Sequence, residues 1–121
     1  MLFYVTLIGL CIHMSGQEKD NRIVFDKTTH DYGTIARKSD GSCVFHFTNI
    51  SKEPLVLSNV TTSCGCTVPS WTKTPVMPGG SGEIRIVYNT RIIGPFNKTI
   101  TATFSNPGQE VQLTIKGSVA K

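Results

Sequence analysis

The sequence contains almost no alanine, the residue that most favours helix formation. It has eleven glycines and six prolines instead, residue types that weaken helices and gather in turns. Charged residues make up only 17% of the chain and apolar residues 39%, a balance that excludes a disordered polar tail. We therefore expect a turn-rich β protein, and 121 residues predict one domain.

Clustered positive charge is also missing. The formal net charge is +4, but the basic residues are scattered, and Arg37 and Lys38 form the only adjacent pair. No stripe of basic and aromatic residues accompanies that pair, so no nucleic-acid partner is expected. No catalytic triad, carboxylate pair or phosphate-binding loop is recognisable either, and we predict that the chain is not an enzyme.

A long hydrophobic run is lacking as well. The longest apolar stretch, residues 1–14, is shorter than the roughly 20 residues that a membrane-spanning helix needs. Because a polar stretch follows Gly16, we interpret 1–16 as a signal peptide and 17–21 as a short polar segment. A first core strand is the alternative, and the absence of Lys or Arg before the run leaves the translation start open. Export to the periplasm or cell surface is expected, without a lipid anchor on Cys11, because Leu10 is not the small residue that such signals place there.

From residue 22 onward the apolar residues alternate with period two, and turn residues interrupt them about every eight to twelve positions, as in a β-sandwich. In the segment 43–47 the side chains of Cys43, Phe45 and Phe47 share one face, which we predict to be the core face. We expect an antiparallel, immunoglobulin-like sandwich of seven or eight strands over residues 22–120, with a loop through Pro69, Trp71 and Pro75. The clearest expected strands are 23–25, 31–35, 43–47, 55–60, 84–88, 99–104 and 111–115.

Several segments together resemble the bacterial domain-of-unknown-function family 1573. The most specific is Cys64-Gly65-Cys66 followed by Pro78-Gly79, and the resemblance covers nearly all of the chain after residue 21. It implies an immunoglobulin-like fold, similar to the domains of abnormal-spindle, Hydin and major sperm proteins, and an exported location, but no activity. The other segments that carry it are 30–35, 47–49, 54–57, 94–100 and 115–117.

The Cys64-Gly65-Cys66 segment is the most unusual chemistry in the sequence. On an extended strand the two α-carbons would lie about 6.6 Å apart, so a disulfide requires a local bend, which Gly65 favours. Three hypotheses remain: a structural pair, a labile redox dithiol, or two ligands of a soft metal such as Cu(I) or Zn²⁺. The candidates to complete a metal site are His30, His46, Cys43 and Met77. No other cofactor is expected.

Further predictions concern individual side chains. Cys43 is expected to be a buried free thiol, or else to pair with one of the other two cysteines and leave the third free. Trp71, in its expected loop, is either a recognition residue or a lid on the open end of the sandwich. His46 is expected on the solvated face, and His30 and Asp31 point to opposite faces and form no dyad. The sequons at Asn49, Asn59 and Asn97 are interpreted as incidental.

These observations favour an exported, non-catalytic module that associates with a protein through its loops or an exposed strand edge. The alternative is a thiol-redox or soft-metal protein centred on Cys64 and Cys66. The sequence names neither a partner nor an oligomeric state.

Overall fold

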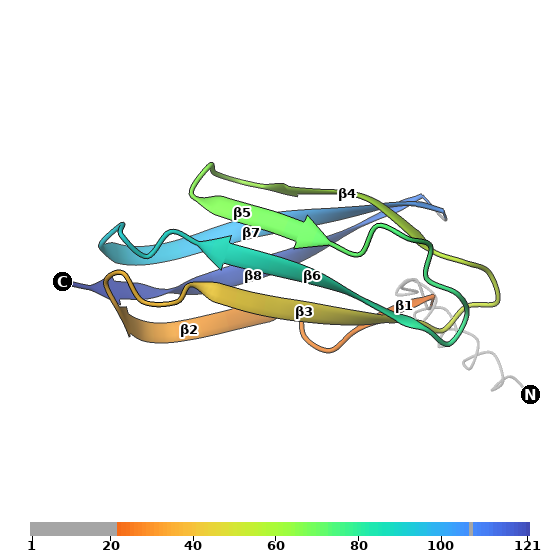
Figure 1. Cartoon of the computed structure of the whole chain (residues 1–121), viewed down its shortest axis with the longest axis horizontal. Helices are drawn as coiled ribbons and strands as arrows, with labels where there is room; N and C mark the ends of the chain where they lie inside the picture. The colour runs from red at the N-terminus through yellow and green to blue at the C-terminus, as the bar shows by residue number, and fades with distance from the viewer. Residues whose placement is uncertain (1–21, 107) are drawn as a thin grey trace, which may run out of the picture.

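A computed structural model describes residues 22–106 and 108–121, and these residues form two facing four-stranded sheets (Figure 1). The described part of the chain contains no helix, and therefore none long and apolar enough to cross a membrane. The predicted immunoglobulin-like sandwich is confirmed, whereas the predicted leader and residues 17–21 lie outside the described residues. The strands are β1 (Ile23–Phe25), β2 (Thr29–Ala36), β3 (Ser42–Asn49), β4 (Val56–Thr62), β5 (Thr67–Trp71), β6 (Ser81–Tyr88), β7 (Gly94–Asn106) and β8 (Gln109–Ala120).

One sheet has the strand order β1-β3-β6-β5 and the other the order β2-β8-β7-β4. Their inner faces carry the apolar side chains at every second position, so the core lies between the two layers. Phe45 lies opposite Ile84, and both side chains are fully buried. Cys43, Phe45 and Phe47 all point inward, as their spacing predicts.

One strand pair departs from the antiparallel expectation. The chain leaves the first sheet after Phe25 and joins the second at Thr29, and there β2 runs parallel to β8. A strand that changes sheets keeps its direction, so it meets a neighbour of the opposite sense on one sheet and of the same sense on the other. β1 is accordingly antiparallel to β3 and β2 is parallel to β8.

The expected loop through Pro69 and Trp71 is wrong, because residues 67–71 form the edge strand β5 paired with β6. Cys66 O accepts from Asn89 N on the β6 side, so by strand alternation the backbone of Pro69 faces the open edge. Proline has no N–H to donate and is tolerated at that position. The proline that suggested a loop therefore marks an edge strand.

Candidate functional site

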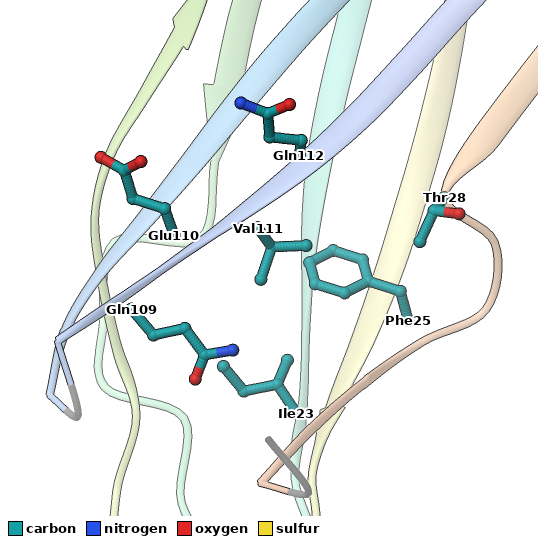
Figure 2. A pocket seen from close by; sticks show the side chains of 7 residues that line it. All are labelled: Ile23, Phe25, Thr28, Gln109, Glu110, Val111 and Gln112. Atoms are coloured by element: carbon teal, nitrogen blue, oxygen red, sulfur yellow. The ribbon is translucent and has the colours of Figure 1, made fainter. Parts of the chain in front are cut away.

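An open groove of about 590 Å³ lies between β1 and the first residues of β8 (Figure 2). Its apolar surface comes from Ile23 and Phe25 on one side and Val111 on the other. These three side chains are partly buried and pack against the core. Polar groups complete the lining, namely Thr28, Gln109, Glu110 and Gln112.

The change of sheet between β1 and β2 leaves this groove open. Asp26 N donates a backbone hydrogen bond to His46 O of β3 at 2.9 Å, and two residues later Thr28 O accepts from Thr114 N of β8 at 2.9 Å. Parallel pairing of β2 with β8 therefore begins at residue 114. Residues 109–113 of β8 pair with β7 on one side, and no described strand pairs with them on the other.

The backbone of this β8 segment presents hydrogen-bonding groups to the open side. Because Thr114 N points toward β2, alternation along the strand directs the N–H and C=O groups of Gln112 and Glu110 to the same edge. Across the groove, Asp26 N points toward β3, so the backbone of Phe25 faces the open side of β1. Two strand edges thus border one apolar groove.

The side-chain amide of Gln109 extends into the groove beside Ile23 (Figure 2). Gln109 Oε1 is buried and has no hydrogen-bond partner among the described residues. A buried acceptor without a donor costs free energy, on the order of 1–3 kcal/mol. The groove therefore contains a site that gains stability when a donor enters it.

Three other strand edges carry features that discourage the addition of a strand. β5 has Pro69, which removes a donor from its open edge. β4 has two irregularities in its register with β7, beside Leu57. β2 has one between Asp31 and Thr34, where Gly33 adopts a φ of 68°. Residues 109–113, in contrast, pair with β7 in regular register and contain no proline.

Cys64 and Cys66 form a disulfide in the turn between β4 and β5, where both are partly buried, with α-carbons 5.4 Å apart. The expected bend is present and is fixed by Thr62 Oγ1, which donates to Cys64 O at 2.7 Å. Gly65 does not adopt a positive φ, and a Cβ there would meet nothing within 4 Å. The bend at Gly65 therefore does not use a left-handed backbone conformation, and the space beside it would accommodate a side chain.

Cys43 does not pair with either of them and is a buried free thiol. Burial raises the pKa of its thiol, although a hydrogen bond with the Tyr32 side chain acts in the opposite direction. Burial likewise raises the pKa of the Tyr32 hydroxyl, which donates to Gly41 O at 2.7 Å. Cys43 is therefore protonated and shielded at neutral pH, a poor nucleophile.

The structure does not gather the candidate metal ligands. No three His, Cys, Asp or Glu side chains within residues 22–106 and 108–121 are placed to hold a metal ion. His30 lies on β2, where its Nδ1 is 3.2 Å from Lys27 Nζ, and partial burial together with that cation lowers its pKa. Met77 is exposed in the segment between β5 and β6.

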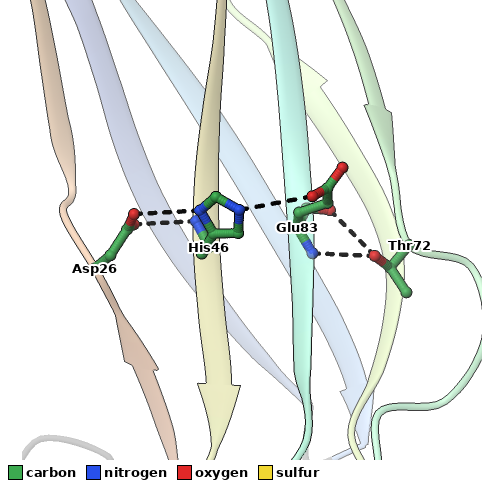
Figure 3. A network of polar contacts seen from close by, with 4 residues as sticks. All are labelled: Asp26, His46, Thr72 and Glu83. Carbon is green, nitrogen blue, oxygen red and sulfur yellow. Dashed lines mark hydrogen bonds and ion pairs between the residues drawn. The ribbon is translucent and has the colours of Figure 1, made fainter.

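His46 lies on the outer face of the first sheet, between two carboxylates (Figure 3). Its Nδ1 is 3.4 Å from Asp26 Oδ2 and its Nε2 is 3.6 Å from Glu83 Oε1. All three side chains are more than 40% exposed, so these pairs add little stability. Thr72 joins the row, because its hydroxyl accepts from Glu83 N at 3.0 Å.

Trp71 ends β5 and does not lie in a loop. Its ring is partly buried against the core, and Lys73 Nζ lies 4.3 Å from the ring centroid. Its indole Nε1 is buried without a hydrogen-bond partner among the described residues. Trp71 thus packs against the core at the edge of the first sheet, and both a recognition role and the closing of the open end of the sandwich stay predictions.

The groove itself was missed by the sequence interpretation. Ile23, Phe25 and Val111 all fall in expected strands, but the alternation of apolar residues does not reveal where a strand changes sheets. The one available signal was the polar segment 26–31, which separates two short apolar segments.

The three cysteines in residues 22–121 are expected to differ sharply toward a thiol-alkylating reagent. Native protein should incorporate no label. After reduction, Cys64 and Cys66 should be alkylated because they lie in a turn and are only partly buried, whereas the buried Cys43 should react only after unfolding. Intact mass after each step counts the labels. Rapid alkylation of Cys43 in the folded state would contradict this prediction, and Cys43→Ser provides the control for the assignment.

A family model described as "Protein of unknown function (DUF1573)" matches residues 23–119. Among solved structures, a protein of unknown function from Porphyromonas gingivalis W83 is similar with 20% identity and a TM-score of 0.70, over 79% of this chain and 46% of that one. The ASH/PapD-like domain 7 of human CEP192 is similar with 8% identity and a TM-score of 0.71, over 86% of this chain and 90% of that one. The YadV chaperone is also similar, with 11% identity and a TM-score of 0.52, over 82% of this chain and 51% of that one.

At these identities the similarities establish the fold alone. The chain spans less than half of the Porphyromonas gingivalis protein. No curated protein matches the chain.

Proposed function

The chain belongs to the DUF1573 family of proteins of unknown function, and from this premise we propose that it is an exported, non-catalytic module that binds proteins. The observation that carries the proposal is the edge of β8 at residues 109–113, which no strand of the described residues covers and which borders an open apolar groove. Strand edges recruit extended polypeptide through main-chain hydrogen bonds, and adjacent pockets supply specificity.

Two further observations support association rather than catalysis. The groove is lined by apolar, amide and threonine side chains around one carboxylate, that of Glu110, and this lining includes no histidine, cysteine, lysine or second carboxylate that could act with it. Structural neighbours include a PapD-like domain and a chaperone, and the resemblance in fold is consistent with a binding module. The predicted leader supports export.

Site-specific photo-crosslinking in the native host tests this function. A benzoylphenylalanine placed at Gln112, on the open edge of β8, is expected to give discrete, protease-sensitive adducts. The same group at Asn97, exposed on the outer face of the second sheet, should give none and serves as control. A third position, Val68 on β5, samples a different strand edge. Absence of adducts at all three positions would rule out the proposed association.

A second candidate function is thiol exchange, favoured by the disulfide, which lies partly exposed in the turn between β4 and β5. In that reaction a partner thiolate attacks one sulfur and forms a mixed disulfide; its second thiol then releases the reduced Cys64 and Cys66 while the partner becomes oxidised. Equilibration in glutathione buffers tests it. A pair that stays oxidised at the poise of the periplasm or endoplasmic reticulum is a framework disulfide, whereas a pair that titrates there is a redox site.

A further inference from the structure

We propose that the groove takes an extended segment of another protein, which adds as a strand beside residues 109–113 of β8 and inserts apolar side chains between the two sheets. This inference rests on the proposed association and names the kind of partner and its position. Three features of the groove determine what can bind there: the backbone groups on the open edge of β8, the apolar side chains of its walls and one amide without a hydrogen-bond partner among the described residues.

The backbone edge requires an extended chain. The N–H and C=O groups of Glu110 and Gln112 alternate along the open side with the spacing of a β-ladder. A small apolar molecule leaves these groups to water, whereas a peptide in β conformation satisfies them in register. Five residues of β8 extend over roughly 17 Å, which sets the length of the segment that can pair.

The walls require alternating side chains. Every second side chain of an added strand would face inward, over Ile23, Phe25 and Val111, where apolar groups gain from burial. The intervening side chains would lie beside Glu110 and Gln112, which are exposed. The partner segment therefore alternates apolar and polar residues, and valine, isoleucine and threonine suit this pattern.

The amide of Gln109 adds a polar requirement. Its buried Oε1 lacks a donor among the described residues and lies at the turn end of the groove, where β8 begins. A hydroxyl or amide on the incoming segment, from threonine, serine or asparagine, would supply the missing hydrogen bond. The expected partner therefore carries one such residue among its apolar, inward-facing positions.

A second copy of this chain that pairs through its own β8 does not meet these requirements. In a copy that pairs edge to edge through its own β8, the inward side chains Gln109 and Val111 already face that copy's own β1. Such pairing extends the sheet but leaves both grooves unfilled. A segment with free side chains on both faces is needed, and this favours a flexible or extended region of a different protein.

The test uses a fluorescein-labelled peptide of sequence Lys-Thr-Val-Thr-Val-Thr-Val-Thr-Lys. Its binding partner is the purified protein, without residues 1–16 if the host removes them. Saturable binding by fluorescence anisotropy is expected, with NMR amide shifts concentrated at residues 109–113. Gln112→Pro removes a donor from the open edge without removing a donor to β7, and we expect at least a roughly tenfold weaker affinity. A peptide whose backbone N–H groups along one edge are N-methylated should bind the unaltered protein no more tightly than the original peptide binds Gln112→Pro.

A matched pair of side-chain variants localises the binding. Ile23→Ser and Val68→Ser each remove an apolar side chain from an edge strand of the first sheet, at opposite edges. The first should weaken peptide binding and the second should not, with thermal melts confirming that both fold. Three results would overturn the inference. They are equal affinity of the two variants for the peptide, NMR amide shifts located away from residues 109–113, and self-association of the protein that covers the groove as its concentration rises. If the photo-crosslinker at Val68 gives adducts but the peptide does not bind beside β8, the proposed protein association would stand and only its placement in this groove would be rejected.

Discussion

Replacing Asn49 by aspartate is expected to lower the free energy of unfolding by about 3–5 kcal/mol, the cost of burying an unpaired charge. Asn49 is fully buried at the end of β3. Its Nδ2 donates to Glu53 O at 2.7 Å and to Val76 O at 2.9 Å, so two chain segments are joined to β3 through one amide. Aspartate removes both donors and directs a negative oxygen at two carbonyl oxygens.

The acceptor side of the same amide is retained in the variant. Asn49 Oδ1 accepts from Ser51 N at 2.8 Å and from Ser51 Oγ at 2.7 Å, and a carboxylate oxygen accepts equally well. The expected loss therefore comes from the Nδ2 side alone. Burial and the facing carbonyls raise the pKa of the new carboxyl above its unfolded value, so the deficit should shrink in acid and grow as pH rises through that pKa.

Urea denaturation at neutral and acidic pH, followed by the fluorescence of the single tryptophan, measures this effect. The matched control is Asn59→Asp, the same change at an exposed sequon on β4, for which a shift within about 0.5 kcal/mol is expected. Equal effects at the two positions, or a deficit that does not depend on pH, would show that the Asn49 amide does not hold the turn.

Alternation of apolar residues was sufficient to predict the sandwich, because inward side chains such as Phe45 and Ile84 are separated from outward ones by strand geometry alone. The same rule placed Cys43 inside and His46 outside. These features depend on neighbours along the chain, and a sequence displays such neighbours directly.

The groove depends on neighbours that are far apart in the sequence. Whether residues 109–113 have a partner on each side is decided by where the chain between Phe25 and Thr29 crosses from one sheet to the other. The polar segment 26–31 is a local sign of a break between two strands, but it does not specify that the chain changes sheets there. For the same reason Pro69 suggested a loop, although its missing N–H marks the open side of an edge strand.

The cysteine segment shows a different limit. Spacing alone indicated that a bend was necessary for a disulfide, and the bend is present, but Gly65 does not provide it through a positive φ. The turn is instead determined by its anchors, Thr62 Oγ1 on Cys64 O and Cys66 O on Asn89 N. One of those anchors is Asn89, the residue that follows β6, which lies more than twenty residues further along the chain.

Gly82→Ala is the second substitution for which a large effect is expected. Gly82 lies opposite Phe47 in the β3–β6 ladder, and a Cβ there would fall 2.5 Å from Phe47 Cζ. The Phe47 ring is fully buried, with Phe104 at 5.3 Å and Phe25 at 5.5 Å between ring centroids. Because neighbouring rings restrict its movement, overpacking should lower the free energy of unfolding by about 1–3 kcal/mol.

A double-mutant cycle identifies the cause of that loss. Phe47→Leu shortens the side chain that the new methyl group would meet, so the two substitutions together should cost less than the sum of their separate effects. The control Gly65→Ala adds a Cβ in open space and should change stability by no more than about 0.5 kcal/mol. Strict additivity in the cycle would show that Gly82 acts through the backbone rather than through contact with Phe47. Phe25 lines the groove and contacts Phe47, so a displaced Phe47 ring should also weaken peptide binding at β8, and Phe47→Leu should restore part of it.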